Sequence, residues 1–494
     1  MTSDLRTRRT QYRLFIGGRW VVGAGQMIES TNPYTGDVWA EVHSASRADV
    51  DAAVSAAAAA SMEWRRTSGV ERARLMLRLA ELMERDARRL AEIETTDNGK
   101  IIRETENQIR FAARNYRFFA GLADKIGGGT QALDSYTMFN YTTREPHGVT
   151  ALITAWNSPL SLLANKLPPA LAAGNTAVVK PSEYTPASTL ELARLVEEAG
   201  FPPGVVNVVV GAAETGRALT SHPRVDMISF TGSVETGRAI AQAAATSIIP
   251  VALELGGKSA NIIFEDADRA RATAGAVAGI FAAAGQTCVA GSRLLVQRGL
   301  VGEILDGVAE KARSITLGDP LDPATEMGPL ANQAQLDKVM TEIEGARRAG
   351  ARLVTGGETL AGERGLFVTP TVFTDVHNDM SVARNEIFGP VLGVQTFEDD
   401  ADAVRIANDT RFGLAAGIWT NSLSRAHLVA KELRAGMVWV NTYRSTAVQA
   451  PFGGIGDSGY ARERGVDAIH GYTRVKNTMI DLSDDVRDPF LLKT

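Results

Sequence analysis

The sequence predicts an α/β protein with two parallel-sheet domains and a smaller β element. From residue 147 onward, short apolar runs rich in β-branched residues alternate with helical segments, a pattern typical of consecutive βαβ units. This alternation is interrupted by a glycine turn at residues 254–257 and then resumes. The chain has 494 residues, too many for one ordinary core, so two or three domains are expected.

The N-terminal part is predicted to be mainly helical. Residues 13–22 have a short strand pattern, and residues 49–63 are rich in alanine. Residues 68–95 repeat apolar side chains at helical spacing, and residues 110–122 form a further helix. The aromatic side chains of that last helix are expected to pack in the core; they are Phe111, Tyr116, Phe118 and Phe119.

The two series that follow are each expected to form a parallel sheet covered by helices. The strands of the first series are expected at 148–153, 176–179, 205–210 and 227–230, with helices at 186–199 and 235–245. The second series begins with a strand at 259–264 and a small-residue helix at 267–284, and continues to about residue 440. A cleft between two α/β domains is a common ligand site.

Two segments fit neither series. Residues 131–143 alternate polar and apolar side chains like a solvent-facing hairpin, and residues 472–494 contain the strand-like stretch TRVKNTMIDL. Exposed strands bind a partner edge, so the two segments are interpreted as an oligomerisation element. An ordinary surface flap is the alternative.

Composition narrows the class of function. Hydrophobic residues make up 45% and charged residues 22% of the chain, and the net charge is only -5, so no nucleic-acid partner is expected. The longest small apolar stretch, 274–285, is too short to span a bilayer, so no membrane contact is expected. One cysteine and six scattered histidines favour no metal site. We expect a cytoplasmic enzyme with a small-molecule substrate.

The only cysteine, Cys288, follows a small-residue helix that ends at Gly285. A single cysteine is usually a buried small hydrophobe, but a loop after a helix end makes the sulfur accessible. A reactive thiol requires this access and a lowered pKa.

Two further side chains follow predicted strands. Glu254 ends the apolar run 248–253 and enters a glycine turn, so it is either a surface charge or a base of raised pKa. Asn157 follows the strand at 148–153, where ligands bind in open α/β sheets, although it would also suit a helix N-cap before Pro159.

Two cofactor signals are weaker. Residues 230–237 (FTGSVETG) form a strand, a glycine turn and a helix start, which can hold a pyrophosphate, but they lack the G-x-G-x-x-G fingerprint. Residues 180–183 (KPSE) can present Lys180 and Glu183 to ribose hydroxyls, or they form a solvated charged loop.

Together these motifs resemble the aldehyde dehydrogenase superfamily over nearly the whole chain. The matching segments are WNSP (156–159), KPSE (180–183), FTGS (230–233), LELGGK (253–258), GQTC (285–288), EIFGP (386–390) and PFGG (451–454), in the family's order. The resemblance implies an NAD-dependent enzyme that oxidises an aldehyde to a free acid and assembles as a homodimer or homotetramer.

The resemblance also implies three regions. Residues 1–126 and 147–256 would form a Rossmann-like cofactor domain, and residues 257–457 a catalytic domain. Residues 127–146 and 458–494 would form the bridging and oligomerisation element.

The roles implied by the resemblance agree with the chemistry of these residues. Cys288 would attack the aldehyde and form a thioester, with the Asn157 amide and the Cys288 backbone N–H holding the oxyanion. Glu254 would then activate water. The implied cofactor contacts are Trp156, Lys180, Ser182, Glu183, Gly216, Phe230, Gly232, Ser233, Gly237, Leu255, Gly256, Glu386 and Phe388. Lys166 would support the site or be an exposed lysine.

The aldehyde itself is not specified by these motifs. Family members for aromatic or fatty aldehydes often have aromatic side chains at positions that here are Ser158, Asn165 and Thr446, whereas Phe452 is retained. Together with Leu162, these four residues would line a substrate tunnel that is more polar than in those family members and suits a compact polar aldehyde or a semialdehyde. Arg444 would bind a substrate carboxylate or be a solvated arginine at the rim.

Three alternative functions are compatible with parts of this pattern. A simple NAD-binding module without turnover would bind the cofactor yet fail a hydride-transfer assay. A CoA-acylating dehydrogenase is associated with the absence of a carboxylate at Glu254, and a binding or structural protein would be expected to have lost Cys288 or Glu254. Both residues are present.

Overall fold

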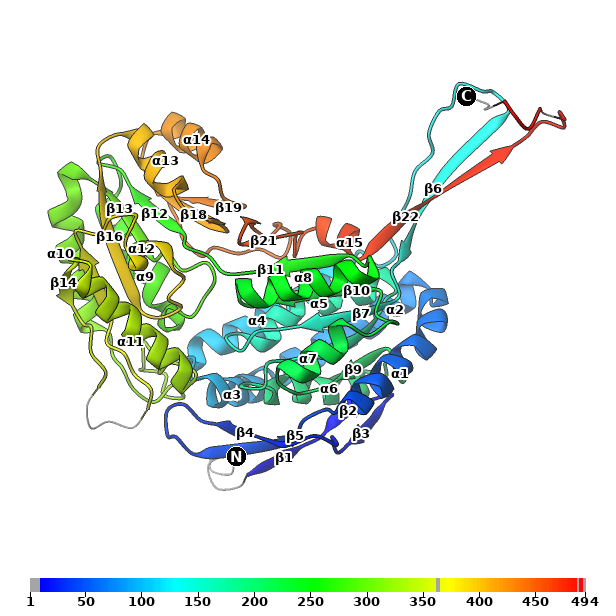
Figure 1. Ribbon diagram of the computed structural model, residues 1–494, viewed down its shortest axis with the longest axis horizontal. Coiled ribbons are helices and arrows are strands. Elements are labelled where there is room, and N and C mark those ends of the chain that lie inside the picture. Colours follow the sequence, from blue (N-terminus) through cyan, green and yellow to red (C-terminus); the bar gives the residue numbers. More distant parts are fainter. Residues whose placement is uncertain (1–8, 361–364, 487, 492–494) are drawn as a thin grey trace.

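The computed structural model describes residues 9–360, 365–486 and 488–491. Two α/β domains lie side by side, and a two-stranded arm projects from one of them (Figure 1). A separate three-stranded sheet near the N-terminus has the order β1-β5-β4. Its strands are β1 Thr10–Tyr12, β4 Met27–Thr31 and β5 Val38–His43. The architecture is the predicted one.

The first domain is built on an eight-stranded sheet of order β21-β11-β10-β7-β8-β9-β2-β3. Its five central strands are parallel, as predicted. They are β7 Val149–Ile153, β8 Thr176–Lys180, β9 Val206–Val208, β10 Met227–Thr231 and β11 Val251–Glu254. These strands are almost wholly buried because helices cover both faces of the sheet (Figure 1).

Both edges of this sheet carry short antiparallel strands. Residues 13–22 form a hairpin of β2 (Leu14–Ile16) and β3 (Arg19–Val21), not one strand, because Gly17 and Gly18 take positive φ at the turn. At the other edge, β21 (Gly459–Tyr460) pairs with β11, although the sequence division places these residues in the oligomerisation segment.

The helices of the first domain follow the predicted pattern with two differences. They are α1 Arg47–Arg66, α2 Gly69–Arg85, α3 Ala87–Asn98, α4 Ile102–Ala120, α5 Pro159–Ala173, α6 Ala187–Ala199, α7 Ala213–Thr220 and α8 Val234–Ser247. The repeat at 68–95 is broken at Asp86, whose φ of -98° and ψ of 12° leave helical geometry. In α4, Tyr116 and Phe119 are fully buried as predicted, whereas Phe111 lines a cavity.

The second domain is built on a seven-stranded sheet of order β14-β15-β16-β13-β12-β18-β19, parallel except for β14. Side chains alternate between its faces: Ile263 and Leu294 enter one core, and Ile262 and Leu295 enter the other. The strands are β12 Ala260–Ile263, β13 Arg293–Gln297, β14 Arg352–Thr355, β15 Thr371–Thr374, β16 Val391–Phe397, β18 Ala415–Trp419 and β19 Met437–Val440. A short pair, β17 (Phe412–Gly413) and β20 (Ile455–Gly456), lies beside them.

Helices cover both faces of this sheet as well. They are α9 Arg269–Phe281, α10 Val301–Ser314, α11 Gln333–Arg348, α12 Ser381–Arg384, α13 Asp400–Asn408 and α14 Leu423–Glu432. Nearer the C-terminus, α15 (Asp467–Gly471) packs instead on α5 of the first domain. The short helices η1 Ala282–Gly285 and η2 Arg298–Leu300 are of the 3-10 type.

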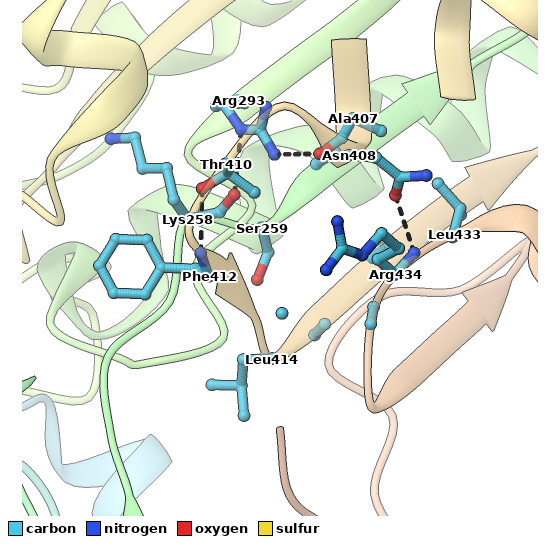
Figure 2. A pocket seen from close by; sticks show the side chains of 15 residues that line it. Lys258, Ser259, Arg293, Ala407, Asn408, Thr410, Phe412, Leu414, Leu433 and Arg434 are labelled. Carbon is cyan, nitrogen blue, oxygen red and sulfur yellow. Dashed lines mark hydrogen bonds between the residues drawn. The ribbon is translucent and has the colours of Figure 1, made fainter. Parts of the chain in front are cut away.

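At the amino ends of its strands, the second sheet is held by buried Arg293 (Figure 2). The guanidinium donates to the carbonyls of Ile406 and Ala407 in the last turn of α13, at 3.0 and 2.7 Å, and to the Lys258 carbonyl at 3.0 Å. The pocket beside it has about 20 Å³, room for about one water molecule. Arg293 therefore anchors the loop between the domains.

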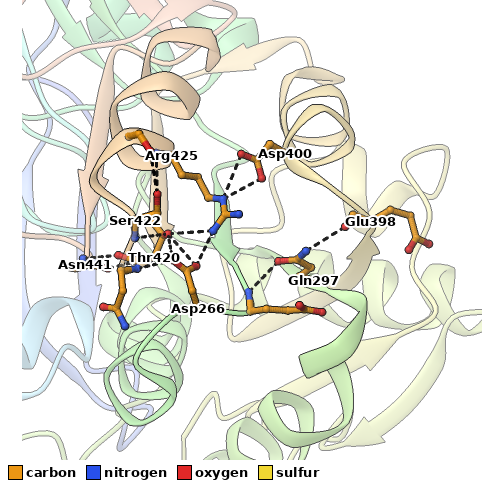
Figure 3. Close-up of polar contacts among 11 residues, drawn as sticks. Asp266, Gln297, Glu398, Asp400, Thr420, Ser422, Arg425 and Asn441 are labelled. Atoms are coloured by element: carbon orange, nitrogen blue, oxygen red, sulfur yellow. Dashed lines mark hydrogen bonds and ion pairs between the residues drawn. The ribbon is translucent and has the colours of Figure 1, made fainter.

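At the carboxyl ends, the same sheet is closed by a polar network (Figure 3). Asp266 follows β12 and accepts hydrogen bonds from Thr420 Oγ1 at 2.7 Å and from Arg425 Nη1 at 2.9 Å. Arg425 also donates from Nε to Asp400 at 3.0 Å and stacks over the Phe264 ring at 4.8 Å. The protein's own ion pairs thus occupy the edge where open α/β sheets usually bind ligands.

The arm joins two segments far apart in the sequence. β6 (Met138–Pro146) pairs antiparallel with β22 (Thr473–Asp481) along its whole length (Figure 1). The prediction of a local hairpin at 131–143 was therefore wrong. Apart from a bridge between Thr130 and Tyr141, the strand in this segment pairs with the C-terminal strand.

Within the described residues, no helix combines the length and the apolar character needed to cross a membrane.

Candidate active site

The site lies where the two domains meet. The first domain contributes residues at or just after the carboxyl ends of its strands: Glu254 ends β11, and Asn157 follows β7. The second domain contributes Cys288 and Glu386 from the loops that precede β13 and β16. Two hydrogen bonds join the parts: Asn157 Nδ2 donates to the Gln286 carbonyl at 3.0 Å, and the Gly257 N–H donates to Glu386 Oε1 at 3.0 Å.

The loop before Cys288 has an unusual backbone. Helix α9 ends at Phe281, earlier than the predicted 284, because Ala283 and Ala284 take a φ of 52°. Gly285 has a φ of 71°, and a Cβ there would lie 2.0 Å from the Gly389 carbonyl oxygen. This turn brings half-buried Cys288 to the wall of a cavity, as access to the sulfur requires.

That cavity has a volume of about 1060 Å³ and lies between α4, α5 and the segment 436–452. All six residues predicted to contact the substrate line it: Ser158, Leu162, Asn165, Arg444, Thr446 and Phe452. The sequence reasoning missed Phe111 and Arg464, which also line it. Asn157 and Cys288 lie in the same wall.

The electrostatics of Cys288 contradict one expectation. Desolvation raises the pKa of the thiol to about 12, and Glu386, Glu254 and Glu463 add to this rise. The lowered pKa that a reactive thiol requires is not found here, because burial desolvates the sulfur and the three carboxyl groups add to the rise. The thiol in this arrangement is protonated near neutral pH, so its attack requires a base.

Glu254 has the properties of such a base. Its side chain is 4% exposed, and neither carboxyl oxygen has a hydrogen-bond partner among the described residues. Burial, followed by the charge of Glu463, raises its pKa well above the ordinary value. The alternative of a surface charge was therefore wrong.

Lys166 is not an exposed lysine. Its side chain is 0% exposed, lies 3.2 Å from Ser229 Oγ and forms an ion pair with Glu463. Both partners come from distant segments, so only the fold reveals the contact. Glu463, which sequence reasoning missed, is one of the charges that raise the pKa of Glu254.

Asn157 is not a helix cap. The N-cap of α5 is Ser158, which makes no capping hydrogen bond. The Ser158 hydroxyl instead accepts a hydrogen bond from Lys100. Asn157 is thus free to direct its amide toward the cysteine loop.

Polar groups also follow the other strands of the first sheet. Lys180 ends β8, its Nζ lies 3.8 Å from Glu183, and burial lowers its pKa. Gly216 packs on it, because a Cβ at that glycine would lie 3.7 Å from Lys180 Cε. Ser182 is buried nearby and accepts from the Tyr184 N–H.

The neighbouring strand β10 ends beside a glycine turn. Thr231 Oγ1 is buried without a partner among the described residues. Ser233 caps α8 by accepting from the Thr236 N–H at 3.2 Å. The glycines allow close packing, since a Cβ at Gly232 would lie 2.4 Å from the Phe230 ring and one at Gly237 would lie 2.6 Å from Leu255.

The loop from the second domain faces this edge. Trp156 and Phe388 meet edge to face with ring centroids 5.2 Å apart. A Cβ at Gly256 would lie 2.0 Å from Glu386 Oε2, so the carboxyl group lies directly against that glycine. Desolvation raises the pKa of Glu386 to about 7. The predicted cofactor residues thus converge from both domains on one region.

Comparison with known proteins agrees with this geometry. The model of the aldehyde dehydrogenase family matches residues 20–478. A (Z)-2-((N-methylformamido)methylene)-5-hydroxybutyrolactone dehydrogenase from Acinetobacter baylyi is 45% identical over 98% of this chain and 100% of its own length. A betaine aldehyde dehydrogenase from Cereibacter sphaeroides is 45% identical over 95% and 97%.

Solved structures are equally similar. An NAD-dependent aldehyde dehydrogenase from Sinorhizobium meliloti superposes with a TM-score of 0.96 at 38% identity, covering 99% of each chain. Betaine aldehyde dehydrogenase from Staphylococcus aureus in complex with NAD⁺ gives a TM-score of 0.96 at 36% identity, covering 99% of this chain and 98% of the other.

The fold and the site define an oxidoreductase of the α/β class. The chain belongs to the aldehyde dehydrogenase family. The predicted fold class, the predicted reaction of aldehyde oxidation and the predicted cofactor, NAD, are confirmed at the level of the family.

Proposed function

We propose that this protein oxidises an aldehyde to a free acid through a thioester on Cys288. The carboxyl group of Glu254 carries this proposal, because it is buried without a hydrogen-bond partner among the described residues and raises the pKa of Cys288. As a base it takes the thiol proton, and the thiolate attacks the aldehyde carbon. The Asn157 amide and the Cys288 N–H then bind the oxyanion.

The second half of the reaction returns the enzyme to its starting state. Bound NAD would supply the hydride acceptor, and loss of hydride from the aldehyde carbon would leave a thioester on Cys288. Glu254 first releases the thiol proton to solvent and becomes a carboxylate again. It then takes a proton from the water molecule whose oxygen attacks the thioester carbonyl. The acid leaves and the Cys288 sulfur is released. A CoA-acylating enzyme would not require a base for this water.

The groups at the first sheet edge support NAD binding. The donor set fits a dinucleotide: Lys180 and Glu183 suit the adenosine ribose, and the orphan Thr231 hydroxyl lies beside the start of α8, where a pyrophosphate is stabilised. Trp156, Glu386 and Phe388 suit the nicotinamide end. The remaining proposed contacts are Ser182, Gly216, Phe230, Gly232, Ser233, Gly237, Leu255 and Gly256.

Trapping the thioester tests the proposed route. Glu254→Gln removes the base for both the thiol and the water, but it also removes a charge that raises the pKa of Cys288, so the sulfur still ionises, more slowly. An aldehyde with NAD should therefore produce an acyl mass on Cys288 that forms slowly and persists, detected by intact-protein mass spectrometry over a time course of acid quenches. Cys288→Ala should carry no acyl mass under the same conditions. An acyl group absent from Cys288, or found on another residue, would contradict the assignment.

We further propose that the substrate is compact and polar. Ser158, Asn165 and Thr446 place hydroxyl and amide groups where the wall would otherwise be aromatic. Comparing kcat/KM for NADH formation among a small polar aldehyde, a long alkanal and benzaldehyde tests this. A strong preference for the hydrophobic aldehydes would contradict it.

The assembly, the domain roles and the location are also proposals. Residues 1–126 and 147–256 bind the cofactor, residues 257–457 hold the nucleophile, and the arm in 127–146 and 458–494 joins copies into a homodimer or homotetramer in the cytoplasm. Apolar side chains on the arm support this, since Phe139, Val475 and Met479 are 45%, 58% and 54% exposed. Light scattering after size-exclusion chromatography measures the number of copies.

A further inference from the structure

We propose that Arg464 makes this enzyme select aldehydes that carry a carboxylate group, by binding that group in the substrate cavity. The inference rests on the proposed function only in placing the aldehyde carbon at Cys288. It deepens the expectation of a polar substrate and moves the charge recognition from Arg444 to another residue.

The guanidinium of Arg464 is held in a fixed place in the wall of the cavity. It lies over two aromatic rings, 5.1 Å from the centroid of Phe111 and 5.0 Å from that of Phe452. Its Nε donates to Asn165 Oδ1 at 2.9 Å, and Nη1 donates to the Thr446 hydroxyl. The residue is only 8% exposed, yet it lines the cavity.

The partners of this buried cation are all neutral. Within the part of the chain that the structure describes, Arg464 forms no ion pair, and its Nη2 donates no hydrogen bond. Arginine carries five N–H donors in a planar fork that matches a carboxylate. Glu463 and Glu254 stabilise this charge without forming an ion pair with it, so an anion that enters the cavity and binds the guanidinium directly would stabilise it further.

Arg444, in contrast, already has its counterion. Its Nη2 lies 2.8 Å from Glu104 Oε1, so the predicted solvated arginine is instead part of an ion pair. This pair is also a poor site for a substrate carboxylate, because Glu104 would repel it. Arg103, at the cavity edge, is exposed and donates to the Thr325 carbonyl.

The charges of the cavity favour an anionic substrate. Its lining contains three arginines, Arg103, Arg444 and Arg464, and a single carboxylate, Glu104. A cationic aldehyde would meet this positive wall. The guanidinium also covers one face of Phe111 and one face of Phe452, which leaves less aromatic surface for a quaternary ammonium group. We therefore expect betaine aldehyde to be a poor substrate, despite the names of several relatives.

Three matched probes test the proposal in the complete enzyme with NAD: succinic semialdehyde, its methyl ester and betaine aldehyde. The wild type should show the highest kcat/KM for the acid, about 10-fold or more above the ester, and the lowest for betaine aldehyde. Arg464→Gln should lower kcat/KM for the acid about 100-fold, mainly by raising KM. The same substitution should change kcat/KM for the ester less than threefold. Arg464→Lys should retain part of the preference for the acid.

The matched control removes the other arginine without changing the net charge of the cavity. In the double variant Glu104→Gln/Arg444→Gln the ratio of kcat/KM for acid over ester should stay within threefold of the wild type. Turnover of the ester shows that each variant is folded. If Arg464→Gln does not fold, Arg464→Lys is compared with the double variant instead. A preference for the acid that is lost equally in both of these variants would overturn the proposal.

Other results also decide the matter. Equal kcat/KM for acid and ester in the wild type, an equal effect of Arg464→Gln on both, or a lost preference only in the double variant would overturn the role of Arg464. If no aldehyde yields NADH with the wild type, the proposed function fails instead.

Discussion

The two parallel sheets present opposite ends to the active site. The first sheet contributes from its carboxyl ends, with Glu254 at the end of β11 and Lys180 at the end of β8. The second contributes from its amino ends, because the loops that hold Cys288 and Glu386 precede β13 and β16. The carboxyl ends of the second sheet are closed by the network around Arg425 (Figure 3).

This contrast shows where the rule that ligands bind at the carboxyl ends of parallel strands applies and where it does not. Ligands usually bind at the carboxyl ends of the strands in open α/β sheets, and the rule correctly located the contribution of the first domain. In the second domain, Asp266 and Asp400 pair with Arg425 at that edge, whereas the Thr231 hydroxyl at the first sheet's edge has no partner among the described residues. A βαβ pattern alone therefore does not identify the functional edge.

The largest expected effect is at the amino edge of the second sheet. Cys288→Ala should lower the rate of NADH formation on the order of 10⁴-fold or more, because no other group supplies the covalent step. Binding of NAD, measured by the quenching of tryptophan fluorescence, should persist. Residual oxidation close to the wild-type rate would show that the second domain does not supply the nucleophile.

A smaller loss is expected at the carboxyl edge of the first sheet. Asn157→Ala removes one oxyanion donor, so kcat should fall about 10²- to 10³-fold. The amide also contacts the Gln286 carbonyl, so the thermal unfolding temperature is the control for a general disturbance. Unchanged kcat would remove Asn157 from the oxyanion site.

The pH profile tests the carboxyl group at the same edge. Because the pKa of Glu254 is raised well above 4.5, its base form is lost as the pH falls, and this loss starts at a higher pH than for an ordinary glutamate. Where thioester hydrolysis limits turnover, kcat should fall up to about tenfold per pH unit on this acidic side. In Glu254→Gln this fall of kcat on the acidic side should disappear. An identical fall of kcat in the variant would show that a group other than Glu254 titrates there.

The cofactor preference should shift more modestly. Glu183 is half-buried beside Lys180, so its carboxylate would repel a 2′-phosphate. Glu183→Gln should raise the ratio of kcat/KM for NADP over NAD about tenfold, whereas Glu198→Gln, an exposed carboxylate paired with Arg85, should not. A wild type that prefers NADP would contradict the assignment.

The smallest effect on catalysis is expected at the closed edge. Arg425→Ala removes a partly exposed guanidinium and should lower the free energy of unfolding by about 1 kcal/mol, with kcat unchanged within twofold. Urea unfolding and steady-state kinetics measure both quantities. A loss of activity as large as that of Asn157→Ala would show that this edge is also functional.

Much of this arrangement was predictable from local patterns. Strand and helix alternation depends on the spacing of apolar residues, so it located Glu254 at a strand end and Asn157 after a strand. The motif order identified Cys288, and the family resemblance indicated the six side chains proposed for the substrate; the structure places all seven around one cavity.

The burial of charged side chains depended on the tertiary structure. Lys166 and Glu463 are 297 residues apart, and Arg464 acquires its environment from Phe111 in a distant helix and from Phe452 in the loop before it. A lysine on a helix and an arginine after a glutamate have the same sequence pattern whether they face water or a core. Only the packing of the chain removes water from such charges and selects their partners, and that selection determines which charges remain free to act.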